Sequence, residues 1–171
     1  MSTIAEAASR AAFYIHHLPN GPKASLKRLM RDTTGHAVPT DAAYYNMLDR
    51  LDREDNALPD DPKAREAAEV KWSLLISLMA FAPDSTTTEG SLGSELAYVD
   101  YSESRLSKFL RTDPSSREFT RELRDIVTRL KGKGRRINWG DLATVLLSTD
   151  HAEVARKRRE VARDYYRIKG A

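Results

Sequence analysis

Cysteine is absent from the 171 residues, which excludes a disulfide framework and a thiolate metal site. Long apolar runs are also missing, because no stretch approaches the roughly 18 apolar residues of a membrane span. Residues 1–10 lack the charged-then-apolar order of a secretory signal. These absences predict a cytoplasmic protein with no membrane partner, in a compartment compatible with reduced thiols.

Catalytic motifs are scarce as well. The sequence has no phosphate-binding glycine loop, no HExxH zinc helix and no nucleophile elbow. The histidines are His16, His17, His36 and His151, and the adjacent pair on a helix points about 100° apart, which disfavours a shared metal ion. The acidic stretch 49–61 has no accompanying His or Lys cluster, which favours a solvated surface connection. We therefore expect no metal, no cofactor and no enzymatic activity.

Positive charge is unevenly distributed along the chain. Residues 1–88 carry 10 Lys and Arg against 12 Asp and Glu, whereas residues 89–171 carry 18 against 13. The second half is therefore basic although the whole chain has a net charge of only +3. Such asymmetry favours a polyanionic partner.

The basic half is organised around a helix expected from Pro114 to Leu130, with Asp113 as its N-cap. Apolar residues at helical spacing form its buried face: Phe119, Leu123, Ile126, Val127 and Leu130. Arginines at i, i+4 and i+7 lie opposite: Arg117, Arg121 and Arg124. The acidic residues are expected on one flank: Glu118, Glu122 and Asp125.

Basic residues recur on the outward sides of the neighbouring segments. The preceding helix, with Asp100 as its expected N-cap, projects Arg105, Lys108 and Arg111. The connector 131–136 places four cations around two glycines, either as a phosphate-binding loop or as a solvated tether. The last helix, starting near Thr149 or Asp150, carries Arg156, Arg159, Arg163 and Arg167 opposite its apolar face. The repetition favours a nucleic-acid surface over a merely solvated charged face.

Helical signals also fill the acidic half. Thr3 and Glu6 have the spacing of a capping box, and Pro22 is the expected first position of a short helix with a basic cluster. After a loop at 35–39, a third helix is expected around 44–51, and Asp61-Pro62 opens a long helix in which Trp72 belongs to the core.

The polar segment 83–90 shows no periodicity and predicts the boundary between two halves. Beyond it, Asn138 is the expected N-cap of a helix whose Trp139 turns inward. Strand-like alternation occurs nowhere in the sequence. The expected class is all-α, with about eight or nine helices in two small bundles, residues 1–88 and 89–171.

An ordered set of segments resembles the CasB family, the small subunit of the type I-E CRISPR Cascade surveillance complex. The segments are GSLGSELAYVDYSESRLSKFLRTD, LRDIV and INWGDLATVLL in the basic half. In the acidic half the resemblance lies in GxxAxLKRL at 21–29 and in Tyr44-Tyr45 ahead of Leu48, and VARDYY near the end is also similar. The match is strongest over 90–147, moderate over 21–51, and weak elsewhere.

The resemblance implies a non-catalytic subunit that works in antiviral defence and is present in two copies in its complex. The implied partners are the backbone and large protein subunits, a second copy of the chain, the guide RNA and the target DNA. The implied role is to stabilise the guide–target hybrid and the displaced strand. Matched by position, the family's basic residues are Lys27, Arg28, Arg105, Arg111 and Arg124. The stripes add further candidates: Lys23, Lys108, Arg117, Arg121, Arg135 and Arg136.

Physical reasoning supports such a role, because opening a duplex against a guide is a near-balanced exchange that small backbone contacts decide. We hypothesise that the matched cations converge on one face spanning both bundles. Two alternatives stay open. One is a helical transcription regulator that reads duplex DNA, and the other is a purely structural adaptor whose arginines meet acidic protein surfaces.

Overall fold

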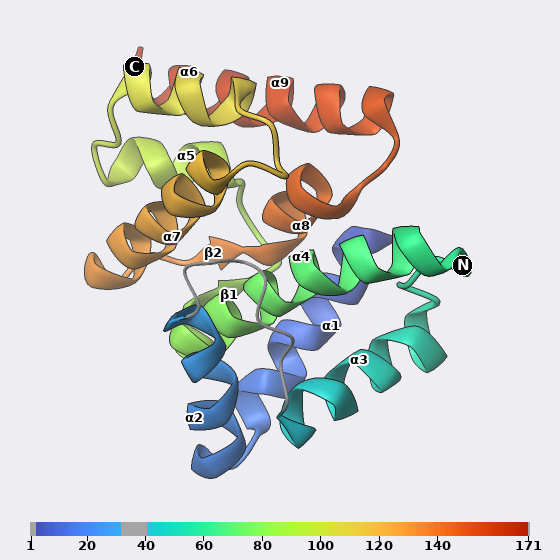
Figure 1. The fold of residues 1–171 in the computed structure, drawn as a ribbon. Helices are drawn as coiled ribbons and strands as arrows, with labels where there is room; N and C mark the ends of the chain where they lie inside the picture. The colour runs from blue at the N-terminus through green and yellow to red at the C-terminus, as the bar shows by residue number, and fades with distance from the viewer. Residues whose placement is uncertain (1–2, 32–40, 171) are drawn as a thin grey trace. The chain divides into compact units, whose positions relative to one another are not determined.

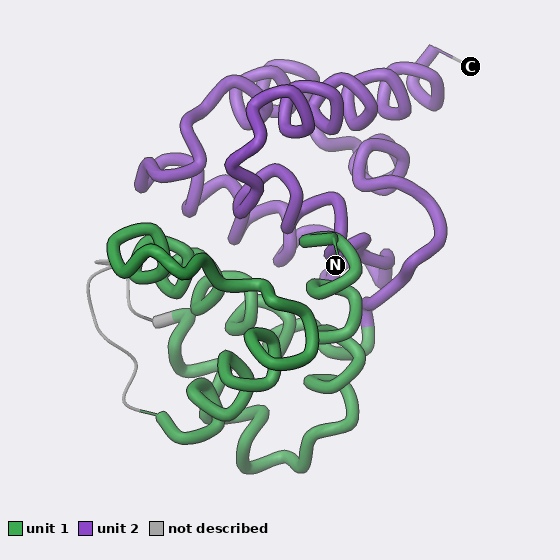
Figure 2. The backbone as a smooth tube through the Cα atoms, turned by 90° about the vertical axis from the view of Figure 1, so that its right-hand side faces the viewer, with its two compact units in different colours: residues 1–84 green, residues 85–171 purple. Residues whose placement is uncertain are grey.

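The chain divides into two compact units. The structure, a computed structural model, describes residues 3–31 and 41–170. The expected loop at 35–39, with His36, lies outside the described residues. Unit 1 is Met1–Asp84 and unit 2 is Ser85–Ala171, distinguished by colour in Figure 2. The division into two domains, residues 1–88 and 89–171, stays a prediction.

The described part of the chain contains nine α-helices, which confirms the expected all-α class (Figure 1). Unit 1 has α1 (Ile4–His17), α2 (Asn20–Arg28), α3 (Ala42–Asp55) and α4 (Pro62–Phe81), with the short 3₁₀ turn η1 (Leu29–Arg31). A second 3₁₀ turn, η2 (Pro83–Ser85), includes the boundary between the units. Unit 2 has α5 (Leu92–Tyr98), α6 (Glu103–Arg111), α7 (Arg117–Gly132), α8 (Trp139–Leu147) and α9 (His151–Lys169).

Helix α4 organises unit 1, since it contacts α1, α2 and α3. The C-terminal half of α4 is buried on almost every side, with Trp72 only 1% exposed. Helix α1 contributes small side chains to the core, Ala7, Ala8, Ala11 and Ala12, which permit close approach of its neighbours. The capping box of Thr3 and Glu6 is present as expected.

Helices α5 and α9 form the most extensive contact in unit 2, and α8 also packs on α9. All nine residues of α8 are buried, including Trp139, and Asn138 caps the helix through Asp141 N as expected. The buried faces of α6 and α7 meet through Phe109 and Phe119, whose rings stack at 4.9 Å.

A two-residue parallel pairing was not foreseen from the sequence. Strand β1 (Thr86–Thr87) pairs with β2 (Ile137–Asn138), in the register Thr86 to Ile137. The Trp139 indole Nε1 donates a hydrogen bond to Thr86 Oγ1 at 3.2 Å. The segment 83–90 is therefore partly ordered, and the contact boundary falls between Asp84 and Ser85.

Three expected helix starts were wrong by two or three residues. Helix α6 is capped by Ser102, because Asp100 lies in the left-handed region with φ 54°. Helix α7 is capped by Ser116, and Asp113 instead accepts a hydrogen bond from Ser115 N. Helix α2 begins at Asn20.

The acidic stretch 49–61 is not simply a surface connection. Helix α3 extends to Asp55, whose side chain is buried and forms an ion pair with Arg10 of α1. Asp52 in the same helix pairs with Arg65 of α4 at 2.6 Å. These two acids therefore join α3 to its neighbours.

Candidate nucleic-acid interface

Helices α6 and α7 place several predicted cations side by side. The stacked rings of Phe109 and Phe119 fix the two helices near the end of α6 and the start of α7. In the same region, Lys108 Nζ lies 2.6 Å from Glu118 Oε1. The link 112–116 between the helices is therefore short and held at both ends.

Arg105 is committed to an internal network. Its Nη2 lies 2.9 Å from Glu122 Oε2 and 2.9 Å from Asp125 Oδ2. Tyr101 donates a hydrogen bond from its hydroxyl to the same Glu122 oxygen at 2.8 Å. Burial alone raises the pKa of Glu122, but the hydrogen bonds from Tyr101 and Arg105 outweigh it and lower that pKa below its ordinary value. Glu122 is buried, which its expected position on one flank of the helix did not predict.

Arg135 is also held by neighbouring side chains. Its Nε and Nη2 donate to Glu95 Oε2 and Oε1 at 2.7 and 3.1 Å, and its guanidinium lies 4.6 Å from the centre of the Tyr98 ring. The hydrogen bond to Glu95 raises the pKa of Arg135. Gly134, with φ 63°, allows the turn that brings Arg135 back over α5. The connector is therefore not a free tether at Arg135.

Three arginines at the junction of α6 and α7 are exposed and, within the described residues, have no ion pair. We name Arg111, Arg117 and Arg121 the corner arginines. Arg111 ends α6, Arg117 begins α7, and Arg121 lies one turn further along the same face. Arg117 sits at the positive end of the α7 dipole, which disfavours a cation unless an anion lies nearby.

The two remaining candidates of unit 2, Arg136 and Arg124, differ from each other in exposure. Arg136 is exposed and, in the part of the chain that is described, has no ion pair. Arg124 is half-buried, so less of its side chain faces solvent than in Arg117 or Arg121. In α9, Arg156 pairs with Glu160, and Arg163 and Arg167 both approach the single carboxylate of Asp164. Arg159 is exposed and has no ion pair among the described residues.

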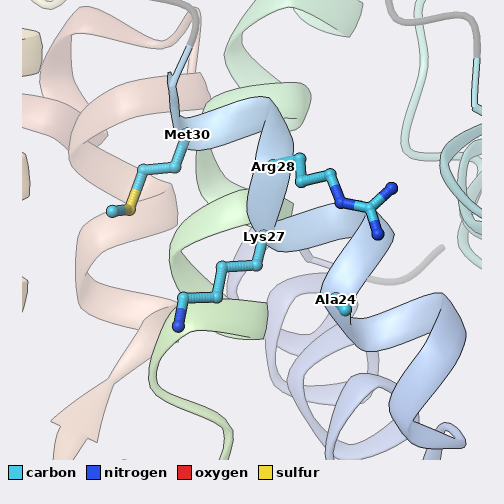
Figure 3. A pocket seen from close by; sticks show the side chains of 4 residues that line it. All are labelled: Ala24, Lys27, Arg28 and Met30. Carbon is cyan, nitrogen blue, oxygen red and sulfur yellow. The ribbon is translucent and has the colours of Figure 1, made fainter.

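The unit 1 candidates lie on α2. Lys23 donates to the His16 carbonyl at 2.7 Å, and the Lys27 ammonium lies 5.4 Å from the centre of the Phe81 ring. Lys27 and Arg28 are exposed and line a shallow hollow with Ala24 and Met30. Figure 3 shows the Lys27 and Arg28 side chains leaving the helix in different directions. They therefore present two separate charges.

The exposed arginines and lysines can bind the phosphates of a nucleic-acid backbone. Tyr98, whose ring lies beside Arg135, was not among the residues predicted from the sequence. The sequence offered no signal for Tyr98, because only the fold brings Arg135 to within 4.6 Å of the centre of its ring. Within the described ranges, no three His, Cys, Asp or Glu side chains are grouped so as to hold a metal ion. None of the helices described combines the length and apolar character that crossing a membrane requires.

Comparison with known proteins agrees with this architecture. The crystal structure of M. ruber CasB superposes with a TM-score of 0.68 at 19% sequence identity, covering 99% of this chain and 96% of that one. A search of curated proteins finds no match. The family model of the CRISPR-associated protein Cse2 matches residues 22–166, which is most of the chain. The protein therefore belongs to the Cse2 family of CRISPR-associated proteins, the family that also bears the name CasB.

Proposed function

We propose that this subunit of a CRISPR Cascade complex is non-catalytic and binds nucleic-acid backbone, stabilising the guide RNA–target DNA hybrid and the displaced strand. Its proposed partners are the guide RNA, the target DNA, the backbone and large protein subunits, and a second copy of itself. The observation that supports the proposal best is the exposure of the corner arginines without an ion pair among the described residues.

Electrostatics favours these three positions over the predicted cations of unit 2 that already have ion pairs. Arg105, Lys108 and Arg135 each lie within 3 Å of a carboxylate of unit 2, so part of their charge is already used within the fold. An exposed arginine without a carboxylate partner releases counterions from a nucleic-acid backbone when it binds a phosphate. Such contacts do not depend on base sequence, which suits a subunit that must accept any guide and target.

The experiment is a Cascade complex that contains the triple variant Arg111→Gln, Arg117→Gln and Arg121→Gln. We expect normal assembly, weaker binding of target DNA, and a salt dependence of the affinity that is less steep by about one counterion per lost contact. The matched control is Arg53→Gln, Arg156→Gln and Arg163→Gln, which removes three exposed cations that have carboxylate partners.

The two alternative functions give other results. A purely structural adaptor leaves DNA affinity unchanged in the corner variant and shows a loss of assembly instead. A regulator of duplex DNA binds duplex with a sequence preference in the absence of any guide. Equal losses in the corner and control variants contradict the proposal, because they reflect net charge alone.

A further inference from the structure

Tyr98 is a large aromatic side chain on the surface of unit 2, with 54% of its area exposed. It is the last residue of α5, and the backbone beyond it is fixed. Val99 is buried, Asp100 adopts a left-handed conformation with φ 54°, and Tyr101 N donates to the Leu96 carbonyl at 3.0 Å. The ring is therefore presented by a rigid helix end.

Arg135 covers part of this ring and is itself held in place. Its two hydrogen bonds to Glu95 orient the guanidinium, which lies 4.6 Å from the ring centre. Glu95 in turn precedes Tyr98 by one helical turn, so all three side chains are braced by α5. A ring with a guanidinium over it and much of its surface exposed offers a flat apolar area to solvent.

The connector that brings Arg135 to Tyr98 carries further cations. Lys133 and Arg136 are exposed on the connector, on either side of Gly134 and Arg135. The two nearby acids are already engaged, Glu95 by Arg135 and Asp100 by Lys169. An exposed ring beside unsatisfied positive charge suits a ligand that is both planar and anionic, as a nucleotide within a strand is.

We propose that Tyr98 is a stacking site for one nucleobase of a single-stranded nucleic acid, with the adjacent phosphates on Lys133 and Arg136. The inference rests on the proposed function and deepens it, because it adds base contact to backbone contact. A paired and stacked base within a duplex cannot lie on the ring, so the site selects a strand that has been opened.

The test compares two DNA probes of equal length and charge, a 20-nucleotide single strand and a strand of abasic residues, with the full chain. The unsubstituted chain is expected to bind the base-containing strand more tightly. Tyr98→Ala is expected to lose at least about fivefold in affinity for that strand and almost nothing for the abasic strand. Tyr98→Trp retains the preference because it retains a planar ring.

Tyr45→Ala is the matched control, since Tyr45 is also a surface tyrosine, 44% exposed, in unit 1. It is expected to leave both affinities unchanged. A second measurement uses 2-aminopurine within the strand, whose fluorescence is quenched on stacking by the unsubstituted chain and is quenched less by Tyr98→Ala.

Two outcomes overturn the stacking site alone. In one, Tyr98→Ala binds the base-containing strand as well as the unsubstituted chain does, and in the other it loses affinity equally for both probes. Salt-dependent binding of both probes leaves the proposed function intact in either case. A chain that binds neither probe contradicts the stacking site and backbone binding together.

Discussion

Gly93 of α5 lies against the backbone of Val161 in α9, so closely that a β-carbon on residue 93 would be 2.0 Å from the Val161 carbonyl oxygen. A contact under 3 Å with backbone cannot be relieved by a side-chain rotation. The absence of a side chain at position 93 is thus what permits the largest helix contact of unit 2.

Replacing Gly93→Ala is expected to force α5 and α9 apart and to lower the free energy of unfolding by about 1–3 kcal/mol. Gly132→Ala is the control, because residue 132 lies in α7 and a β-carbon there would meet only open space. It should be neutral or stabilise by up to about 1 kcal/mol, since alanine favours helix. Chemical denaturation measures both, and equal stabilities of the two variants refute the packing argument.

Glu122→Gln tests the network with Tyr101 and Arg105. The folded-state pKa of Glu122 is depressed, so its stabilisation is present above the ordinary value of 4.5 and is lost as pH falls through the lower folded-state pKa. We expect the variant to be less stable by about 1–3 kcal/mol at neutral pH, because a buried charge-assisted hydrogen bond is weakened.

Thermal unfolding across pH 2–7 gives the measurement. The difference between the unsubstituted chain and Glu122→Gln should narrow below pH 4.5. Glu118→Gln removes the same charge from a half-exposed pair with Lys108 and is expected to change stability little. If the difference in stability between the two chains stays constant with pH, the contacts of Tyr101 and Arg105 do not depend on the ionisation of Glu122.

Arg105→Gln and Arg111→Gln separate structural from binding cations on one helix. Arg105 is held by two carboxylates, so its loss is expected to cost about 1 kcal/mol of stability, limited because a third of the side chain is exposed. Arg111 is exposed and should affect DNA affinity with no change in stability. Denaturation and strand-binding titrations of both variants check this, and the reverse pattern would disprove the assignment.

Asp141→Ala tests how α8 is tied to α5 and α9. Its carboxylate accepts hydrogen bonds from Leu92 N at 2.9 Å and from Lys157 Nζ at 2.8 Å, and the side chain is buried. We expect a loss of about 2 kcal/mol in the free energy of unfolding. The exposed Asp84→Ala should fall within about 0.5 kcal/mol of the unsubstituted chain. A similar loss in both variants would rule out a special role for Asp141.

Helical periodicity and capping residues predicted most of the fold. Thr3, Asp61 and Asn138 cap the helices predicted for them, and both tryptophans are buried. Where two capping residues stand close together, as at Asp100 and Ser102, local sequence does not decide between them. A strand of two residues is too short to show the alternation of apolar and polar residues that indicates a strand. The sequence therefore could not predict β1 and β2.

The sequence did not distinguish the ion-paired cations of the candidate site from the exposed ones, because the ion pairs form between helices. A periodic stripe shows which side of a helix a cation occupies, but not whether a carboxylate from another helix meets it there. Arg105 and Arg111 look alike in sequence, yet Arg105 is held by acids of α7 and Arg111 is not. Buried Asp55 and Glu122 likewise have partners that only the packed fold supplies.

The contact between α5 and α9 can form only late in synthesis, because the two helices lie at opposite ends of unit 2 in the sequence. Helix α5 is the first helix of unit 2 to be synthesised and α9 the last, so the close contact between Gly93 and Val161 cannot form until α9 emerges. Unit 1 is released whole before that moment. Unit 2 therefore cannot complete its core before the last of its described helices has been synthesised.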